Sequence, residues 1–279
     1  MRLRSLLFVP GDRPERFDKA AASGADALIL DLEDSVAASA KDSARAAVAA
    51  RLRAARGDVA VFVRINPLDT DLSVGDLGAL HGLAPDAIVL PKAEGAASVR
   101  LLADRLAAAG IDSPILPIAT ETPAAIFQLG SYASVAPHLA GLTWGAEDLP
   151  AAIGASTARE ADGGYTAPYQ FARALTLFGA HAAGVAAIET VFPDFRDLDA
   201  LAAYAARGRR DGFTGMMAIH PAQVPVINAA FTPSDAERAA AQAIVDLFAA
   251  NPGAGALQLD GRMVDAPHLK QARRILGLA

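Results

Sequence analysis

Short apolar runs alternate along the chain with longer stretches of helical periodicity. The runs are four to six residues long and rich in aliphatic side chains, as expected for strands buried on both faces of a parallel sheet. Alanine-rich stretches between them place apolar residues three and four positions apart, which is typical of amphipathic helices. The predicted strands are residues 5–9, 27–31, 59–64, 87–91, 115–119, 139–144, 186–189 and 215–219.

Eight repeated strand–helix units predict an α/β protein with a closed (β/α)8 TIM barrel. No Gly-x-Gly-x-x-Gly follows the first strand, so a dinucleotide-binding doubly wound sheet is not favoured. We expect the barrel, as the catalytic domain, to occupy residues 1–232. Residues 233–279 exceed what a barrel needs and predict a helical and hairpin C-terminal extension, with an Asp260-Gly261 turn between two short strands.

Composition and charge narrow the possible functions. The chain has 279 residues, of which 53% are hydrophobic, so it can bury a large core. The net charge of −6 argues against nucleic acid as a partner, and the absence of cysteine excludes disulfides and a thiolate nucleophile. The apolar run at residues 6–9 is too short for a signal peptide or membrane span. We therefore expect a cytoplasmic protein without membrane contact.

Polar side chains follow every predicted strand. A barrel brings the carboxyl ends of all its strands to one face, where barrel enzymes build their active sites. The loops at the opposite ends have plainer turn chemistry, such as Gly57-Asp58. The polar residues at the expected barrel mouth are Asp12, Arg13, Arg16, Asp31, Glu33, Asp34, Arg64, Asn66, Lys92, Glu121, Glu147, Asp148, Glu189 and His220.

Two of these acids suggest a metal site. Glu121 and Asp148 follow the fifth and sixth predicted strands, and neither has a cysteine or histidine nearby. Oxygen ligands alone suit a hard cation such as Mg²⁺, which binds one or two carboxylates together with waters and substrate. Alternatively, both acids could cap the helices that follow, since each precedes a proline near a helix start. These residues by themselves leave both interpretations open.

Seven motifs occur in order and resemble the citrate lyase β-subunit-like family, which is grouped with the malyl-CoA and citramalyl-CoA lyases in the HpcH/HpaI aldolase superfamily. The resemblance covers nearly the whole chain, from Arg4 to residues 265–269. The motifs are Ser-Leu-Leu-Phe-Val-Pro-Gly (5–11), Leu-Asp-Leu-Glu-Asp-Ser-Val (30–36), Val-Arg-Ile-Asn (63–66), Leu-Pro-Lys (90–92), Glu-Thr (121–122), Gly-Ala-Glu-Asp-Leu (145–149) and Ala-Ile-His-Pro (218–221).

The resemblance implies a Mg²⁺-dependent carbon–carbon lyase. Such an enzyme cleaves or forms a 3-hydroxy dicarboxylic acyl-CoA thioester, such as malyl-CoA or citramalyl-CoA, and the products are a 2-oxo acid (glyoxylate or pyruvate) and acetyl-CoA. It implies that Glu121 and Asp148 bind the metal and that Arg64 binds the substrate carboxylate. It further implies that Asp265 reaches a neighbouring subunit's active site, which predicts a homo-oligomer, either a trimer or a hexamer.

The second strand end offers further catalytic acids. Strand alternation would place Asp31 and Glu33 on one face and Asp34 on the other. We predict that Glu33 and Asp34 belong to the site. Arg64 could instead form a salt bridge with an acid of this strand end, but its place after a run of Val and Phe favours a side chain that faces the site.

Basic residues at the mouth are candidates for binding coenzyme A or substrate. Arg13, Arg16 and Lys19 flank the start of the first helix, where phosphates are favoured, and Lys92 follows the fourth strand. Met216 stands where many family members carry lysine, so the carrier of the thioester, coenzyme A or an acyl-carrier protein, stays open.

Three rival functions remain at this stage. Lys92 could form a Schiff base in a metal-independent aldolase. The same metal, with Asp265 directing water, could make the protein a malyl-CoA thioesterase. The chain could also be a non-catalytic or obligate partner subunit. The model for an obligate subunit is the β subunit of a citrate lyase complex, which cleaves citryl-acyl-carrier protein to oxaloacetate together with other subunits.

Overall fold

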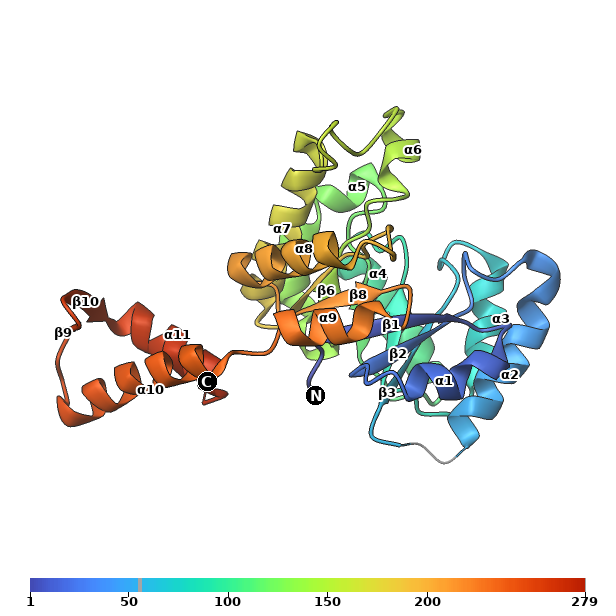
Figure 1. The fold of residues 1–279 in the computed structure, drawn as a ribbon. Helices are drawn as coiled ribbons and strands as arrows, with labels where there is room; N and C mark the ends of the chain where they lie inside the picture. Colours follow the sequence, from blue (N-terminus) through green and yellow to red (C-terminus); the bar gives the residue numbers. More distant parts are fainter. Residues whose placement is uncertain (55–56, 279) are drawn as a thin grey trace. The chain divides into compact units, whose positions relative to one another are not determined.

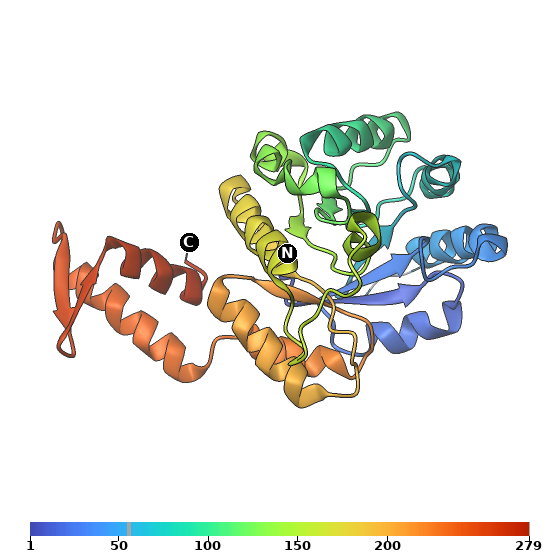
Figure 2. The same ribbon diagram turned by 90° about the horizontal axis from the view of Figure 1, so that it is seen from above.

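The computed structural model describes residues 1–54 and 57–278. Contacts divide the chain into two compact units, Met1–Phe231 and Thr232–Ala279. In the first unit parallel strands form a central ring with helices around it (Figures 1 and 2). The strands are β1 (Ser5–Pro10), β2 (Ala27–Asp31), β3 (Ala60–Arg64), β4 (Ala87–Leu90), β5 (Ile115–Pro117), β6 (Gly141–Thr143), β7 (Ala186–Glu189) and β8 (Gly215–Ala218).

Helical segments connect successive strands. Within the described residues, no helix combines the length and apolar character needed to cross a lipid bilayer. The α-helices of the first unit are α1 (Phe17–Ala21), α2 (Lys41–Arg53), α3 (Asp71–Leu80), α4 (Ala96–Ala108), α5 (Pro123–Ile126), α6 (Leu149–Ile153), α7 (Ala167–Ala183), α8 (Leu198–Asp211) and α9 (Gln223–Ala230). The 3₁₀ segments are η1 (Pro14–Arg16), η2 (Ala38–Ala40) and η3 (Leu129–His138).

The sheet order confirms the predicted (β/α)8 barrel. Neighbouring strands pair in parallel in the order β5-β4-β3-β2-β1-β8-β7-β6. Two parallel bridges, Ile115 with Leu139 and Ile118 with Thr143, join the two ends of this order and close the ring. The fifth and sixth strands are shorter than predicted, so Glu121 and Asp148 stand on loops several residues beyond the strand ends.

Strand alternation separates two apolar cores. Side chains such as Ile29 and Phe62 fill the inside of the barrel, whereas Leu28 and Val61 pack between the strands and the helices. The alternation of β2 and β3 therefore directs their last residues, Asp31 and Arg64, inward. The sequence places charge here, at the strand ends, where the apolar interior meets the mouth.

The second unit is a helix pair with a hairpin between the helices. Ser234 and Glu237 form a capping box at the start of the first helix. Asp260 and Gly261 both have positive φ angles, 49° and 77°, as a tight two-residue hairpin turn requires. The elements are α10 (Asp235–Ala250), β9 (Ala256–Leu259), β10 (Arg262–Asp265) and α11 (Ala266–Leu276).

Candidate active site

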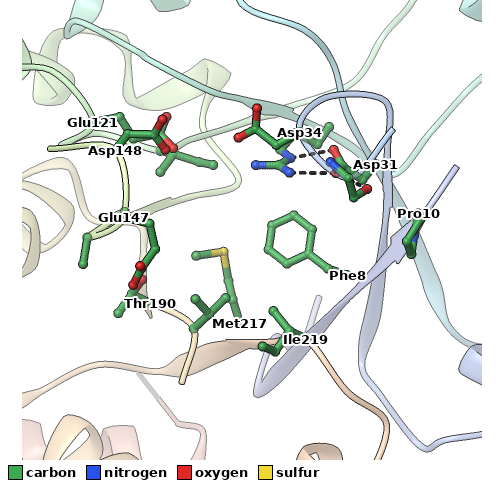
Figure 3. Close-up of a pocket in the computed structure, with 16 residues that line it drawn as sticks. Phe8, Pro10, Asp31, Asp34, Glu121, Glu147, Asp148, Thr190, Met217 and Ile219 are labelled. Carbon is green, nitrogen blue, oxygen red and sulfur yellow. Dashed lines mark hydrogen bonds and ion pairs between the residues drawn. The ribbon is translucent and has the colours of Figure 1, made fainter. Parts of the chain in front are cut away.

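A cavity of about 320 Å³ opens at the carboxyl ends of the barrel strands. Figure 3 shows its acidic side chains, together with an apolar wall that includes Phe8, Met217 and Ile219. The lining contains five carboxylates and a single cationic side chain, that of Arg64. The lining residues are Phe8, Pro10, Asp31, Asp34, Ser35, Arg64, Ile118, Glu121, Gly145, Ala146, Glu147, Asp148, Thr190, Val191, Met217 and Ile219.

Arg64 and Asp31 form a two-pronged ion pair across neighbouring strands. The register of β2 and β3 pairs these residues directly. Arg64 Nε lies 2.6 Å from Asp31 Oδ1 and Nη2 lies 2.7 Å from Oδ2. Burial alone would raise the pKa of Asp31, but hydrogen bonds from Arg64 and Ser35 outweigh it and lower that pKa. Arg64 thus makes the salt bridge that the sequence left as an alternative and also faces the cavity.

Glu33 and Asp34 do not follow the alternation that the sequence analysis extended through them. β2 ends at Asp31, and the chain then turns, with the N–H of Val36 donating to the carbonyl of Glu33. Asp34 lines the cavity, whereas Glu33 is buried beneath it, with Oε2 lying 2.7 Å from Nη1 of Arg64. Burial raises the pKa of Glu33 despite this contact. The structure therefore adds Asp31 to the predicted acids as the principal partner of Arg64.

Glu121 is a buried carboxylate with little compensation. Its Oε2 accepts a hydrogen bond of 2.5 Å from the backbone N–H of Lys92. Burial is the main cause that raises the pKa of Glu121 to about 8; the hydrogen bond from Lys92 lowers this pKa, and the nearby charges of Glu33 and Asp148 raise it. Glu121 is thus a group that needs either a proton or a cation at neutral pH.

Lys92 has two separate contacts at the mouth. Its φ angle is +49°, which is uncommon for a residue other than glycine and turns its N–H toward Glu121. Its Nζ lies 3.1 Å from Glu33 Oε1 and 3.7 Å from Asp148 Oδ1. Burial would lower the pKa of Lys92, but these carboxylates raise it. The Lys92 ammonium therefore stays charged between the carboxylates of Glu33 and Asp148.

Thr120 fixes the loops that carry the two candidate metal ligands. Its hydroxyl donates to the carbonyl of Gly145 at 2.9 Å and accepts the N–H of Gly145 at 3.1 Å. A Cβ at residue 145 would lie 3.0 Å from Cγ of Glu121, so glycine makes room for this carboxylate. Neither role could be predicted from the sequence, because nothing in the local pattern shows which loops meet across the barrel.

The donor set fits a magnesium ion. The residues that the structure describes contain no group of three Asp, Glu, His or Cys side chains able to hold a metal ion by themselves. Two carboxylates, Glu121 and Asp148, line one cavity with an excess of negative charge (Figure 3). Mg²⁺ needs no more than one or two protein carboxylates, because waters and substrate oxygens complete its shell. Asp148 keeps about a third of its side chain exposed, so it can accept a ligand from solvent.

The predicted coenzyme A residues lie outside this cavity. Arg13 and Arg16 follow β1, and 55% and 60% of their side chains are exposed. Lys19 is also exposed, on α1. None of the three is among the lining residues, so their role in binding the carrier stays a prediction.

Met216 does not remove a cation from the cavity. Met217 on the same strand points into the barrel and lines the cavity, so the neighbouring Met216 points outward and packs in the outer core. There it pairs in register with Glu189, whose carboxylate is held by Arg173 at 2.7 Å. A lysine at residue 216 would start between the strands and the helices, away from the cavity.

Asp265 is the N-cap of α11. Its side chain accepts a hydrogen bond from the backbone at the start of the helix, and its Oδ1 lies 2.5 Å from His268 Nδ1. Asp265 thus has a structural role as a helix cap. Its predicted catalytic role in a neighbouring subunit stays a prediction.

Comparisons with known proteins agree with this geometry. Residues 4–221 match the family model described as HpcH/HpaI aldolase/citrate lyase. The chain belongs to this family. It is 40% identical over 271 residues to a citrate lyase subunit beta-like protein of Mycobacterium tuberculosis, covering 97% of this chain and 93% of that protein. It is 32% identical over 280 residues to a (3S)-malyl-CoA thioesterase of Cereibacter sphaeroides, covering 99% and 94% of the two chains.

A solved structure of the family is also similar. The crystal structure of protein CitE from Mycobacterium tuberculosis in complex with magnesium, acetoacetate and coenzyme A has a TM-score of 0.85 and 36% sequence identity. The match covers 100% of this chain and 98% of that one. The resemblance inferred from the motifs and the assignment to a family of aldolases and lyases are thereby confirmed, and magnesium is confirmed as a ligand of this relative.

Proposed function

We propose that this protein is a Mg²⁺-dependent carbon–carbon lyase for a 3-hydroxy dicarboxylic acyl-CoA thioester of the malyl-CoA or citramalyl-CoA type. The products are a 2-oxo acid, glyoxylate or pyruvate, and acetyl-CoA. The observation that carries the proposal is the presence, in one cavity, of a preorganised arginine and two carboxylates, the buried Glu121 and the partly exposed Asp148, whose contact with the Lys92 ammonium is as long as 3.7 Å. The magnesium, acetoacetate and coenzyme A named for the related CitE structure support the same chemistry.

The residues divide the work of an aldol cleavage. Arg64 is fixed by Asp31, and its remaining N–H groups bind the carboxylate that becomes part of the 2-oxo acid. Glu121 and Asp148 would hold Mg²⁺, which would supply a Lewis acid for the oxygen at the carbon that becomes the carbonyl of the 2-oxo acid. Phe8, Met217 and other apolar lining residues exclude water from the bond that breaks.

Proton transfer at the thioester needs a further group. Cleavage leaves the α-carbon of the acetyl thioester as a carbanion equivalent that must take up a proton. We assign this step to Asp265 of a neighbouring subunit in a homo-oligomer. The hydrogen bond to His268 lowers the pKa of Asp265, so its carboxylate is ionised and can act as a base. In cleavage it would take up the substrate's hydroxyl proton as the carbon–carbon bond breaks and return that proton to the α-carbon, and in condensation it would take the α-proton and return it to the new hydroxyl group.

The test is turnover of purified protein with (3S)-malyl-CoA and with citramalyl-CoA. We expect acetyl-CoA and the matching 2-oxo acid to form in magnesium and to stop forming in excess EDTA. Formation of product that EDTA leaves unchanged would contradict the assignment. A Schiff base at Lys92 is disfavoured because the ion pairs raise the pKa of this ammonium, and borohydride with pyruvate should therefore not label the protein.

Thioester hydrolysis is the second candidate, and the similarity to a (3S)-malyl-CoA thioesterase favours it specifically. The same Arg64 and metal would hold malyl-CoA, and Asp265 would direct a water onto the thioester carbonyl. The products separate the two reactions, because hydrolysis releases free malate and coenzyme A, whereas cleavage releases glyoxylate and acetyl-CoA.

The carrier of the acyl group also needs a test. The similarity to a citrate lyase subunit beta-like protein leaves an acyl-carrier protein as a possible donor. Comparing malyl-CoA with citryl-acyl-carrier protein as substrates decides this. Turnover only of the protein-bound thioester would make the chain a citrate lyase β subunit.

A further inference from the structure

A buried lysine lies directly beneath the acids of the second strand end. Lys41, the first residue of α2, is only 8% exposed. Its ammonium donates to the carbonyls of Leu32 and Glu33 at 2.6 and 2.8 Å and to Oδ1 of Asn66 at 2.9 Å. These three acceptors use all three N–H groups of the ammonium. None of these hydrogen-bond partners is a carboxylate: two are backbone carbonyls and the third is the side-chain amide oxygen of Asn66.

Two of the three acceptors, the carbonyls of Leu32 and Glu33, belong to the turn that presents the site acids. The N–H of Glu33 donates to Asp31 Oδ1 at 2.9 Å, and its carbonyl accepts from Lys41. The backbone of Glu33 is thus held on both sides, while its side chain contacts Arg64 and Lys92. Moving this turn would move Glu33 and change how many carboxylates surround the guanidinium.

Asn66 extends the same network to the third strand end. It lies two residues beyond Arg64, and its Nδ2 donates to the carbonyl of Leu32 at 2.9 Å and to Asp76 Oδ2 at 2.7 Å. Asp76 is fully buried and accepts from Nε of Arg45 at 2.8 Å. The network therefore joins the turn after β2, the loop after β3 and helices α2 and α3.

We propose that Lys41 is a positioning residue, whose buried ammonium sets the place of Glu33 and Asp31 against Arg64 and thereby the reactivity of the site. The inference rests on the proposed function for its effect on turnover, but its effect on the turn does not. A buried ammonium is costly unless it is hydrogen-bonded, and the acceptors that satisfy Lys41 include the carbonyls of the turn that carries Glu33 toward Arg64.

The experiment compares Lys41→Met, Lys41→Arg and the control Arg53→Met, which removes an exposed cation from the other end of α2. For Lys41→Met we expect kcat to fall about 100-fold while KM for the thioester changes less than about threefold, because the reacting groups are misplaced but the carrier contacts remain. Lys41→Arg, which keeps charge and donors, should lose about tenfold. Arg53→Met should match the wild type.

Hydrogen exchange gives a readout that needs no turnover. The amides of Glu33, Ser35 and Val36 are hydrogen-bonded within the turn, and we expect them to exchange about tenfold faster in Lys41→Met while amides of the barrel strands stay protected. If the wild type cleaves no thioester, the proposed function fails, but exchange still decides whether Lys41 orders the turn.

Several results would overturn the inference. One is a Lys41→Met protein with kcat within about threefold of the wild type or with unchanged exchange at residues 31–36. Another is an equal loss of kcat in Arg53→Met. If Lys41→Met does not fold, Lys41→Arg decides: slower turnover with faster exchange at the turn supports the inference, and unchanged values make Lys41 a purely structural residue.

Discussion

The two sides of the barrel mouth treat charge in opposite ways. On the side of β2 and β3, Asp31 and Glu33 meet Arg64, and a buried network beneath them satisfies the backbone. On the side of β5 and β6, Glu121 is buried with one backbone hydrogen bond and two neighbouring carboxylates that repel it. On the β2–β3 side, the completed side, the protein itself supplies the cation that balances the carboxylates. On the β5–β6 side, the incomplete side, Glu121 needs a proton or a cation from solution.

This difference explains how a single cavity can bind an anion and a cation. The completed side offers a guanidinium held rigid before substrate arrives, which limits the entropy lost on binding. The incomplete side keeps its charge available for a metal, because carboxylates already neutralised by arginine would have little affinity for Mg²⁺. The rigid guanidinium of Arg64 and the carboxylates available to a metal thus belong to different strand ends of the same pocket.

Breaking the incomplete side should have the largest effect. Glu121→Ala or Asp148→Ala should lower kcat/KM by at least ~1000-fold and abolish magnesium binding, because the metal loses half of its protein ligands. Calorimetric titration with magnesium and the thioester assay measure both effects. Asp104→Ala, which removes an exposed acid from α4, should change neither. Magnesium binding retained in Glu121→Ala would reject the metal assignment.

Breaking the completed side should cost both binding and stability. Arg64→Ala leaves Asp31 charged and 1% exposed, so we expect the free energy of unfolding to fall by about 3 kcal/mol. In the condensation direction, KM for the 2-oxo acid should rise about 100-fold, since a charged hydrogen-bonded pair is lost. Denaturant unfolding and initial rates measure these changes. The double variant Arg64→Ala/Asp31→Ala should recover stability but not KM; full recovery of both would contradict the role of Arg64.

A smaller change should move one ligand without removing it. Gly145→Ala places a methyl group 3.0 Å from Glu121 Cγ, so the carboxylate must shift by a few tenths of an ångström. We expect magnesium affinity to fall about tenfold while the fold stays intact. Gly130→Ala is the matched control, because a Cβ there meets nothing within 4 Å. Equal magnesium affinities in the two variants would show that residue 145 does not constrain Glu121.

The pH dependence of magnesium binding should show whether Glu121, on the incomplete side, is protonated in the metal-free protein. Burial raises the pKa of Glu121 to about 8, so the metal-free protein holds a proton there at pH 7 that magnesium must displace. Affinity should therefore rise about fivefold between pH 7 and pH 8 and fall as the pH drops below 7. Titrations in buffers of different ionisation enthalpy should show release of nearly one proton at pH 7. No proton release would mean that Glu121 is already ionised.

The sequence predicted the barrel and most of the mouth because both follow from local patterns. Apolar runs identify strands buried on two faces, and parallel strands bring their carboxyl ends together, so Arg64, Glu121 and Asp148 could be placed at one face without coordinates. Family motifs at the same positions agreed. These inferences need only the order and polarity of residues.

The remaining errors arose where the outcome depends on register or on a turn. Alternation applies only within a strand, and β2 ends at Asp31, so the sides taken by Glu33 and Asp34 could not be deduced from it. The pairing of Asp31 with Arg64 is a matter of strand register, which local sequence does not specify. For Met216 the missing lysine left the carrier of the thioester open, although the strand directs this side chain outward, away from the cavity.

Lys92 contacts the site in two independent ways, through its backbone and through its side chain. Its amide meets Glu121 through the main chain, and its ammonium meets Glu33 and Asp148 through a flexible side chain. A glycine there would adopt the left-handed conformation without strain and would keep the first contact while losing the second. A substitution at residue 92 could thus remove the positive charge between Glu33 and Asp148 and still keep the backbone hydrogen bond to Glu121.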